Sequence, residues 1–311
     1  MDHATADQPS SPVLRGEHPR RGRWIDLLTQ RWVCATGRLL DLREHAWLAG
    51  PYGEPWRIGA DFFERYAHRC GLRVRCSGGD GGLVASMDEL CGGGFDADRL
   101  APAVRDFYEH TAAYQLDLWS QWCGVFRPLG WVIRRVFAAP LQQLNLPMHP
   151  LATAHGITSQ IVELCDAGSG RRVTTGWLRR TVEDGAVLYA GCYGTCTPPG
   201  LGRPCVKVVF PLPNGSATVI MRPELRERGS LLLLSEGRRI GDAGFYFLVY
   251  RSPTTASVRY VRSMRETIAV AAGENGAAHA DHTLTLWRMT FLRMRYRMVR
   301  APGERGGRRC P

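Results

Sequence analysis

Four charged residues stand in segments that otherwise alternate like β-strands: Lys207, Arg222, Arg262 and Glu266. Lys207 is the single lysine among 40 basic residues, the remaining 39 being arginine. Lysine carries a compact ammonium whose pKa falls readily on burial, and burial among apolar side chains raises the pKa of a glutamate. The sequence therefore predicts Lys207 and Glu266 as candidate catalytic groups. The alternative is that all four are surface charges, because charged side chains are seldom buried unless they are paired.

The dipeptide Asn214-Gly215 predicts a tight β-hairpin, because a type I′ turn needs two residues that tolerate positive φ. Taken as the loop, it places apolar pairs on one face and a cationic pair on the other: Leu212 with Ala217, Phe210 with Val219, Val208 with Met221, and Lys207 with Arg222. Two directly opposed cations are unfavourable in a sheet. This register predicts that Lys207 and Arg222 either face water or together hold an anionic or enolate-like group of a ligand.

A second hairpin is predicted at Asn275-Gly276 by the same signal. Its register gives four pairs: Met264 with Trp287, Tyr260 with Phe291, Arg262 with Met289, and Glu266 with Thr285. We interpret the face formed by these pairs as the lining of a ligand site in which Glu266 is an acid or base. The predicted ligand-binding residues are Arg222, Arg262, Met264, Trp287 and Phe291.

The apolar residues of the last predicted strand change parity after Phe291. Such a change is typical of a β-bulge or a barrel corner. It leaves Arg293, Arg295 and Arg297 on the opposite side. We interpret these arginines as a solvated face, with an anion-binding row as the alternative.

Metal and cofactor motifs are missing from the sequence. The close cysteine group Cys192, Cys196 and Cys205 has neither a CxxC pair nor a neighbouring histidine, so buried thiols are predicted rather than a zinc site. The glycine clusters lack the strand-to-helix context of a phosphate loop, and there is no G-x-S-x-G nucleophile motif. His279 and His282, with Asp281 between them, lie at a predicted hairpin end and could ligate a metal, but the sequence does not assemble three ligands. We expect neither a metal nor a cofactor.

The net charge of +11 invites a nucleic-acid interpretation. The basic residues form no basic helix, interleaved aromatic stripe or zinc knuckle, which specific nucleic-acid binders carry. Charge alone supports only weak, salt-sensitive attraction to polyanions. We therefore expect no specific nucleic-acid partner, and the identity of any protein partner stays unknown.

The chain divides into a helical part, a sheet and two tails. Residues 1–22 and 300–311 are predicted to be disordered basic tails, residues 23–157 a mainly helical layer, and residues 158–299 an antiparallel β-sheet or barrel. The helices are expected within 24–48, 59–70, 102–122 and 131–139, and residues 142–147 as a strand or loop. The predicted strands are 158–165, 172–180, 186–194, 205–212, 216–222, 230–235, 244–250, 258–271 and 281–298. This α+β plan, lipocalin-like or START-like, is expected to form one folding unit.

The N-terminus has no apolar segment of a secretory signal, and no run approaches the length of a transmembrane helix. The ten cysteines do not follow a disulfide framework. The sequence predicts a cytoplasmic protein with reduced thiols.

Three stretches resemble a group of poorly characterised bacterial proteins, some of them YndJ-like. They are Phe107–Thr111, Leu141–Pro147 and Pro204–Gly215. In that group a soluble region of this kind accompanies a membrane portion, and this sequence shows no such portion. The resemblance covers most of residues 24–298 and implies no catalytic residues.

Sheets and barrels roofed by helices enclose cavities suited to small ligands. We therefore expect binding of an apolar small molecule, with cofactor-independent cyclisation or isomerisation as the chemistry if the protein is an enzyme. The alternative is a non-enzymatic interaction or structural protein whose sheet edge or basic tails meet a partner.

Overall fold

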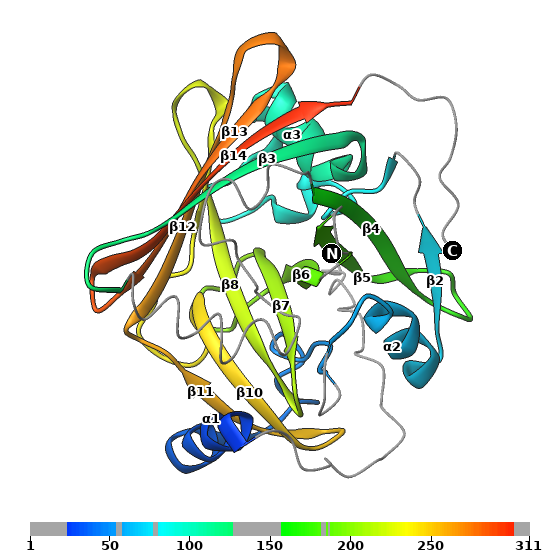
Figure 1. Ribbon diagram of the computed structural model, residues 1–311, viewed down its shortest axis with the longest axis vertical. Helices are drawn as coiled ribbons and strands as arrows, with labels where there is room; N and C mark the ends of the chain where they lie inside the picture. The colour runs from blue at the N-terminus through cyan, green and yellow to red at the C-terminus, as the bar shows by residue number, and fades with distance from the viewer. Residues whose placement is uncertain are drawn as a thin grey trace, which may run out of the picture.

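The computed structural model describes residues 24–53, 58–76, 80–126, 157–181, 185 and 187–301 (Figure 1). The predicted tail 1–22, the predicted helix 131–139 and the segment 142–147 lie outside the described residues. Of the predicted tail 300–311 only the first two residues are described, and Arg300 belongs to the last strand.

An antiparallel sheet dominates the chain, as the succession of alternating segments predicts. Its hydrogen-bonded order is β2-β4-β5-β6-β7-β8-β9-β12-β13-β14-β3. The strands are β2 (Leu72–Cys76), β3 (Tyr114–Trp122), β4 (Ile157–Asp166), β5 (Arg172–Thr181), β6 (Val187–Cys196), β7 (Cys205–Leu212), β8 (Gly215–Leu225), β9 (Leu231–Leu234), β12 (Met264–Ala272), β13 (Ala278–Leu286) and β14 (Met289–Arg300). Among the described residues no pairing joins β2 to β3, so the sheet is open.

The sheet branches at β8, because the two halves of this strand pair with different partners. Residues 215–220 pair with β10 (Gly244–Ser252), and residues 222–225 pair with β9. From β10 the branch continues through β11 (Thr255–Tyr260) to β1 (Arg38–Asp41), beside α1 (Trp24–Thr36) at the bottom of Figure 1. The single strand predicted over 258–271 is therefore wrong, since its two ends belong to β11 and β12.

The helices of the described N-terminal part are short and alternate with strands. Helix α2 (Phe62–Cys70) confirms the helix predicted over 59–70, whereas α1 ends at Thr36, well before residue 48. The helix predicted over 102–122 is wrong: α3 covers only Pro102–Glu109, and its continuation is β3. Residues 114–122 pair with β14 along their whole length, so sheet pairing overrides the helical spacing. The mainly helical layer over 23–157 is not confirmed.

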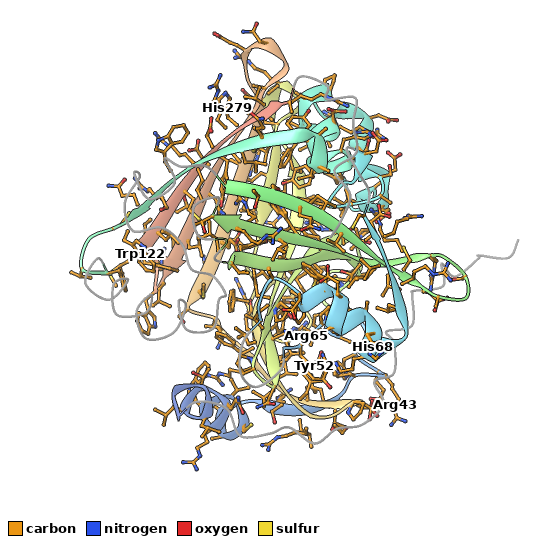
Figure 2. The ribbon with its side chains drawn as sticks, turned by 45° about the vertical axis from the view of Figure 1, so that its right-hand side comes forward. Arg43, Tyr52, Arg65, His68, Trp122 and His279 are labelled. Carbon is orange, nitrogen blue, oxygen red and sulfur yellow. The ribbon has the colours of Figure 1, made fainter. Side chains whose placement is uncertain are left out.

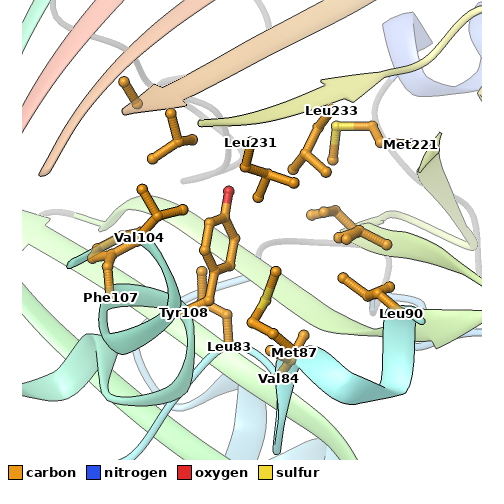
Figure 3. Packing of buried hydrophobic residues seen from close by; sticks show 14 of the residues in the cluster. Leu83, Val84, Met87, Leu90, Val104, Phe107, Tyr108, Met221, Leu231 and Leu233 are labelled. Atoms are coloured by element: carbon orange, nitrogen blue, oxygen red, sulfur yellow. The ribbon is translucent and has the colours of Figure 1, made fainter. Parts of the chain in front are cut away.

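The sheet curls around one apolar core that both of its halves share. Ile161 and Trp177 from β4 and β5 belong to the same buried cluster as Val270, Ala280 and Met298 from β12, β13 and β14. We call the side of the sheet that carries them the inner face. Residues 83–108, including α3, fill this side and bring a set of apolar side chains against β8 and β9 (Figure 3): Leu83, Val84, Met87, Leu90, Val104, Phe107 and Tyr108.

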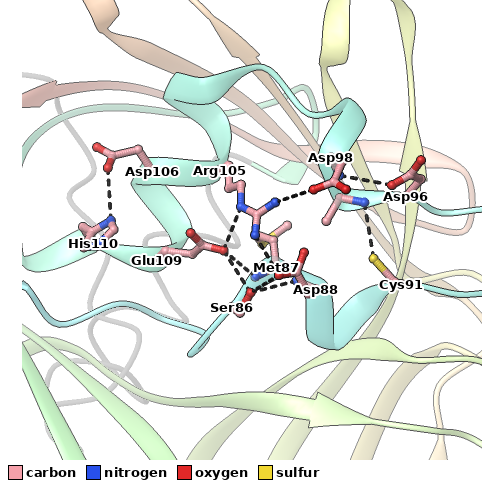
Figure 4. Close-up of polar contacts among 11 residues, drawn as sticks. Ser86, Met87, Asp88, Cys91, Asp96, Asp98, Arg105, Asp106, Glu109 and His110 are labelled. Carbon is pink, nitrogen blue, oxygen red and sulfur yellow. Dashed lines mark hydrogen bonds and ion pairs between the residues drawn. The ribbon is translucent and has the colours of Figure 1, made fainter.

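A network of ion pairs centred on Arg105 of α3 holds residues 83–108 together (Figure 4). Its guanidinium nitrogens lie 2.8 Å from Asp88, 3.0 Å from Asp98 and 3.1 Å from Glu109. Glu109 also accepts a 2.7 Å hydrogen bond from the backbone N–H of Met87. Because Asp88, Asp98 and Glu109 all lie within or directly beside this segment, we assign the network a structural role.

The first predicted hairpin exists, but its register differs by two residues. Leu212 pairs with Gly215, which puts Lys207 opposite Ile220 instead of Arg222. A Cβ at residue 215 would lie 2.1 Å from the carbonyl oxygen of Leu248, so the close approach of β10 requires glycine inside the strand. The predicted opposition of Lys207 and Arg222 is wrong, although the two-residue shift keeps each side chain on its predicted face.

The second predicted hairpin is shifted by one residue, which exchanges the faces of the paired strands. Glu266 pairs with Leu284 instead of Thr285, because the loop has three residues, Glu274–Gly276. Trp287 and Arg288 form a separate two-residue turn with positive φ angles, so 281–298 is two strands.

The bulge predicted at Phe291 is confirmed. Leu284 pairs with Leu292 and Thr285 with Thr290, which leaves Phe291 as the extra residue of β14. Beyond it the buried and exposed side chains alternate, with three exposed arginines: Arg293, Arg295 and Arg297. Arg295 forms a 3.0 Å ion pair with Asp281, which agrees with a solvated face.

Candidate functional site

Lys207 lies on the opposite side of the sheet from Glu266. Its neighbours Val206 and Val208 face the inner core, so Lys207 itself faces outward. Its Nζ donates a 3.0 Å hydrogen bond to the carbonyl oxygen of Ala49. Burial of the ammonium lowers the pKa of Lys207. This lysine therefore cannot act on a molecule held beside Glu266.

The other predicted binding residues are dispersed. Arg222 forms ion pairs with Glu224 and, at 3.3 Å, with Glu236. Arg262 is exposed in the turn before β12. The register that predicted one binding wall is wrong, so these cations do not line it.

The three predicted apolar residues also separate. Trp287 is 66% exposed at the β13–β14 turn. Phe291 packs against Trp122, whose ring centroid is 6.1 Å away, at the end of β3 (Figure 2). Of the seven predicted residues, Met264 and Glu266 alone face the inner core.

Glu266 pairs with His282, which the sequence offered only as a possible metal ligand. Its Oε1 lies 2.6 Å from Nε2 of His282 on the neighbouring strand. Ile268 is the direct cross-strand partner of His282, so Glu266 and His282 are diagonal neighbours on the inner face. Their side chains are 8% and 12% exposed, and a buried carboxylate–imidazole pair can accept and return a proton.

Tyr296 of β14 connects this pair to the opposite half of the sheet. Its ring stacks on His282 with 6.3 Å between ring centroids. Arg179 of β5 lies over two aromatic rings. Its guanidinium carbon is 5.7 Å from the Tyr296 ring centroid and 4.9 Å from the Trp177 ring centroid. Burial raises the pKa of Tyr296, and Arg179 opposes that shift.

Arg179 is the most unusual member of the site. It is 6% exposed, and its Nε and Nη2 atoms have no hydrogen-bond partner in the described part of the chain. Trp177, two residues earlier on the same face, donates a 2.7 Å hydrogen bond from Nε1 to Oγ of Ser159. Buried guanidinium donors without hydrogen-bond partners are costly, so these two atoms make Arg179 a candidate ligand-binding residue.

Two tyrosines of β6, Tyr189 and Tyr193, lie beside these residues on the inner face. The hydroxyl groups of Tyr189 and Tyr193 are hydrogen-bonded to each other. Burial raises the pKa of both hydroxyls well above the usual range, and Glu266 adds to the shift of Tyr193. Gly191 lies between them, where a Cβ would come within 2.6 Å of the Tyr189 hydroxyl.

We call this set the Tyr296 cluster: Ser159, Trp177, Arg179, Tyr189, Tyr193, Glu266, His282 and Tyr296. Glu266 was predicted from sequence as a catalytic group, His282 was considered only as a possible metal ligand, and the other members were missed. A signal existed for Arg179, because it shares parity with Trp177 in the predicted strand 172–180. His282 was hidden by the one-residue register error, which placed it on the wrong face.

The described residues contain no group of three or more His, Cys, Asp or Glu side chains arranged to hold a metal ion. Cys192, Cys196 and Cys205 are buried free thiols. The expectation of reduced thiols holds for eight described cysteines and not for Cys76, which is disulfide-bonded.

Within the described residues no helix is both long enough and apolar enough to cross a membrane. No family model and no solved structure matches the chain. The chain is 29% identical over 228 residues to a protein of Bacillus subtilis (strain 168) named "Uncharacterized membrane protein YndJ". The match covers 72% of this chain and 39% of that relative, so the chain spans about two fifths of its length. The similarity supports the resemblance to a poorly characterised YndJ-like group.

Proposed function

We propose that the protein binds a small, largely apolar molecule against the inner face of the sheet, at the Tyr296 cluster. The convergence of Arg179, Glu266 and His282 on Tyr296, from opposite halves of the sheet, carries this proposal. A few polar groups set in an apolar wall are typical of small-molecule sites. A ligand-binding plan of lipocalin-like or START-like kind is part of the proposal.

The chemistry that fits the cluster is proton transfer without a cofactor. Glu266 and His282 form the pair that removes and returns a proton, which is what an isomerisation or cyclisation of an apolar substrate requires. Lys207 has no part in this version of the proposal, because it lies on the other side of the sheet.

Native mass spectrometry of freshly purified protein tests the proposal. We expect a co-purified small molecule on the wild type, retained by the control Asp281→Asn and reduced by Glu266→Gln and Tyr296→Phe. Asp281 is a suitable control because it lies on β13 with a 71% exposed side chain. A folded wild type that carries no small molecule and takes up no apolar probe would refute ligand binding.

A non-enzymatic interaction protein is the second candidate, favoured by apolar side chains exposed near the β13–β14 turn. Trp287 is 66% exposed and Met289 50% exposed. Val125, 76% exposed, follows β3, the strand that pairs with β14. A photocrosslinker at Trp287 that captures a second protein, while one at the exposed Arg265 does not, would favour this candidate.

Cytoplasmic residence is kept as part of the proposal. The name of the relative places that protein in a membrane, so location is an experimental question. Fractionation of cells that express the tagged chain decides between the cytosol and the membrane fraction.

A further inference from the structure

We infer that the ligand of the Tyr296 cluster carries an anionic group with two accessible oxygens, a carboxylate or a phosphate, and that Arg179 binds it. This inference rests on the proposed function. It adds the chemical class of the ligand: an amphipathic acid with an apolar body and one anionic end.

The described residues around Arg179 contact the flat side of its guanidinium and give Nε and Nη2 no hydrogen bond. Trp177 and Tyr296 present their rings to Arg179, with the guanidinium carbon 4.9 Å and 5.7 Å from the two centroids. Aromatic faces attract the flat side of a guanidinium. They leave its N–H groups, which point outward in the guanidinium plane, available to another partner.

The two atoms without partners are the ones that an anion would use. Nε and Nη2 of Arg179 are buried and have no hydrogen bond among the described residues. The N–H groups of Nε and Nη2 point to the same side of the guanidinium and match the two oxygens of a carboxylate or phosphate. Lysine, with one point of charge, would not offer this fork.

The buried carboxylates of the described chain are engaged elsewhere. Glu266 is paired with His282 at 2.6 Å. Glu163, 8% exposed on β4, is paired with Arg75 and lies 3.7 Å from Arg172. With both of these carboxylates engaged, we infer that a bound molecule supplies the negative charge that complements Arg179.

The body of the ligand follows from the rest of the inner face. The Tyr296 cluster adjoins partly buried apolar side chains of the same core, including Met264 and Ile268. A molecule anchored by its anionic end at Arg179 would place an apolar chain or ring against them.

Three probes with the same chain test the inference: dodecanoic acid, dodecyl phosphate and dodecanol. Binding is followed by isothermal titration calorimetry and by the fluorescence of the protein at pH 7.5. For the wild type we expect at least one anionic probe to bind about tenfold or more tightly than the alcohol. The better of the two anions distinguishes a carboxylate site from a phosphate site.

Arg179→Gln and Arg179→Lys should abolish most of that preference, because neither offers the charged fork. The matched control is Arg180→Gln, at the next position of β5 and on the other face. Circular dichroism of each variant establishes that it is folded, and the comparison of probes on the wild type stands even if a variant is not.

Equal affinity of the wild type for acid, phosphate and alcohol would overturn the inference and leave the proposed function in place. The same holds if Arg179→Gln, folded, keeps the full preference for an anion. Failure of all three probes to bind, together with absence of a co-purified molecule, would overturn the proposed function itself.

Discussion

The carboxylate of Glu266 lies 2.6 Å from Nε2 of His282 inside the sheet, and the pairing depends on a single residue of register. With Glu266 opposite Leu284, His282 shares its face. The register predicted from Asn275-Gly276 would have turned the imidazole outward, because a one-residue slip exchanges faces. The three-residue loop Glu274–Gly276 therefore decides whether the pair exists.

Glu266 and His282 should show strong energetic coupling in a double-mutant cycle. We expect Glu266→Gln, His282→Gln and the double variant to give a coupling free energy of about 1–3 kcal/mol, because each single change leaves a buried polar group without its partner. Urea unfolding of the four proteins measures it. The exposed pair Asp281–Arg295, with 3.0 Å between its atoms, is the control. Coupling no larger than that of the control would show that water screens the buried pair as well.

Gly191→Ala should disturb the Tyr296 cluster from within β6. The added Cβ would lie 2.6 Å from the Tyr189 hydroxyl and displace it from Tyr193. We expect a loss of about 1–3 kcal/mol in the free energy of unfolding, as for other overpacked positions, together with weaker ligand binding.

Gly194→Ala is the matched control for this change. It lies on the same strand with no heavy atom within 4 Å of its added Cβ. A similar loss in both variants would assign the effect to strand glycines in general rather than to contact with Tyr189.

The sequence predicts strands and faces better than registers. The alternation in the later part of the chain identified most strands, the bulge at Phe291 and the exposed arginines, because alternation is local. Residues 114–122 have the spacing of a helix, and their pairing with β14, which is distant in the chain, makes them a strand. Of the Tyr296 cluster, only Glu266 was predicted as a site residue. The other members come together through contacts between strands that are far apart in the chain.

Lys207 should make stability depend on alkaline pH. Burial lowers its pKa in the folded state below the value of 10.5 expected for the unfolded chain. Between these two pKa values the unfolded state binds more protons, so the folded state gains stability as pH rises through that window. Below the folded pKa the penalty for burying the charge is fully present.

Lys207→Met should remove this pH dependence, because no charge remains to be buried, whereas Lys207→Arg should keep the penalty at every pH tested. Unfolding free energies from pH 7 to pH 10.5 measure the difference. Parallel pH profiles for the wild type and Lys207→Met would show that the ammonium is hydrated in the folded protein.

Alkylation should separate the cysteines into reactive and protected groups. Burial raises the pKa of Cys196 to about 11 and that of Cys205 to about 12, so little thiolate is present near neutrality. Cys91 is exposed. With iodoacetamide at pH 8, mass spectrometry should find Cys91 modified first and the other two only after denaturation. Equal rates for Cys91 and Cys205 in folded protein would contradict the buried position of Cys205.

The turn Trp287-Arg288 should be improvable without loss of function. Both residues adopt positive φ, 48° and 68°, in a two-residue hairpin loop for which Asn-Gly is preferred. We expect W287N/R288G to raise the free energy of unfolding by about 0.5–1 kcal/mol, because it removes the strain of two side chains in this region.

Gly276→Ala is the control in the opposite direction. The φ angle of Gly276 is 75° and no atom lies near an added Cβ, so backbone strain alone should destabilise this variant. Because Trp287 is 66% exposed and away from the Tyr296 cluster, ligand binding should not change. Weaker ligand binding by the stabilised variant would show that Trp287 belongs to the binding site, as the sequence predicted.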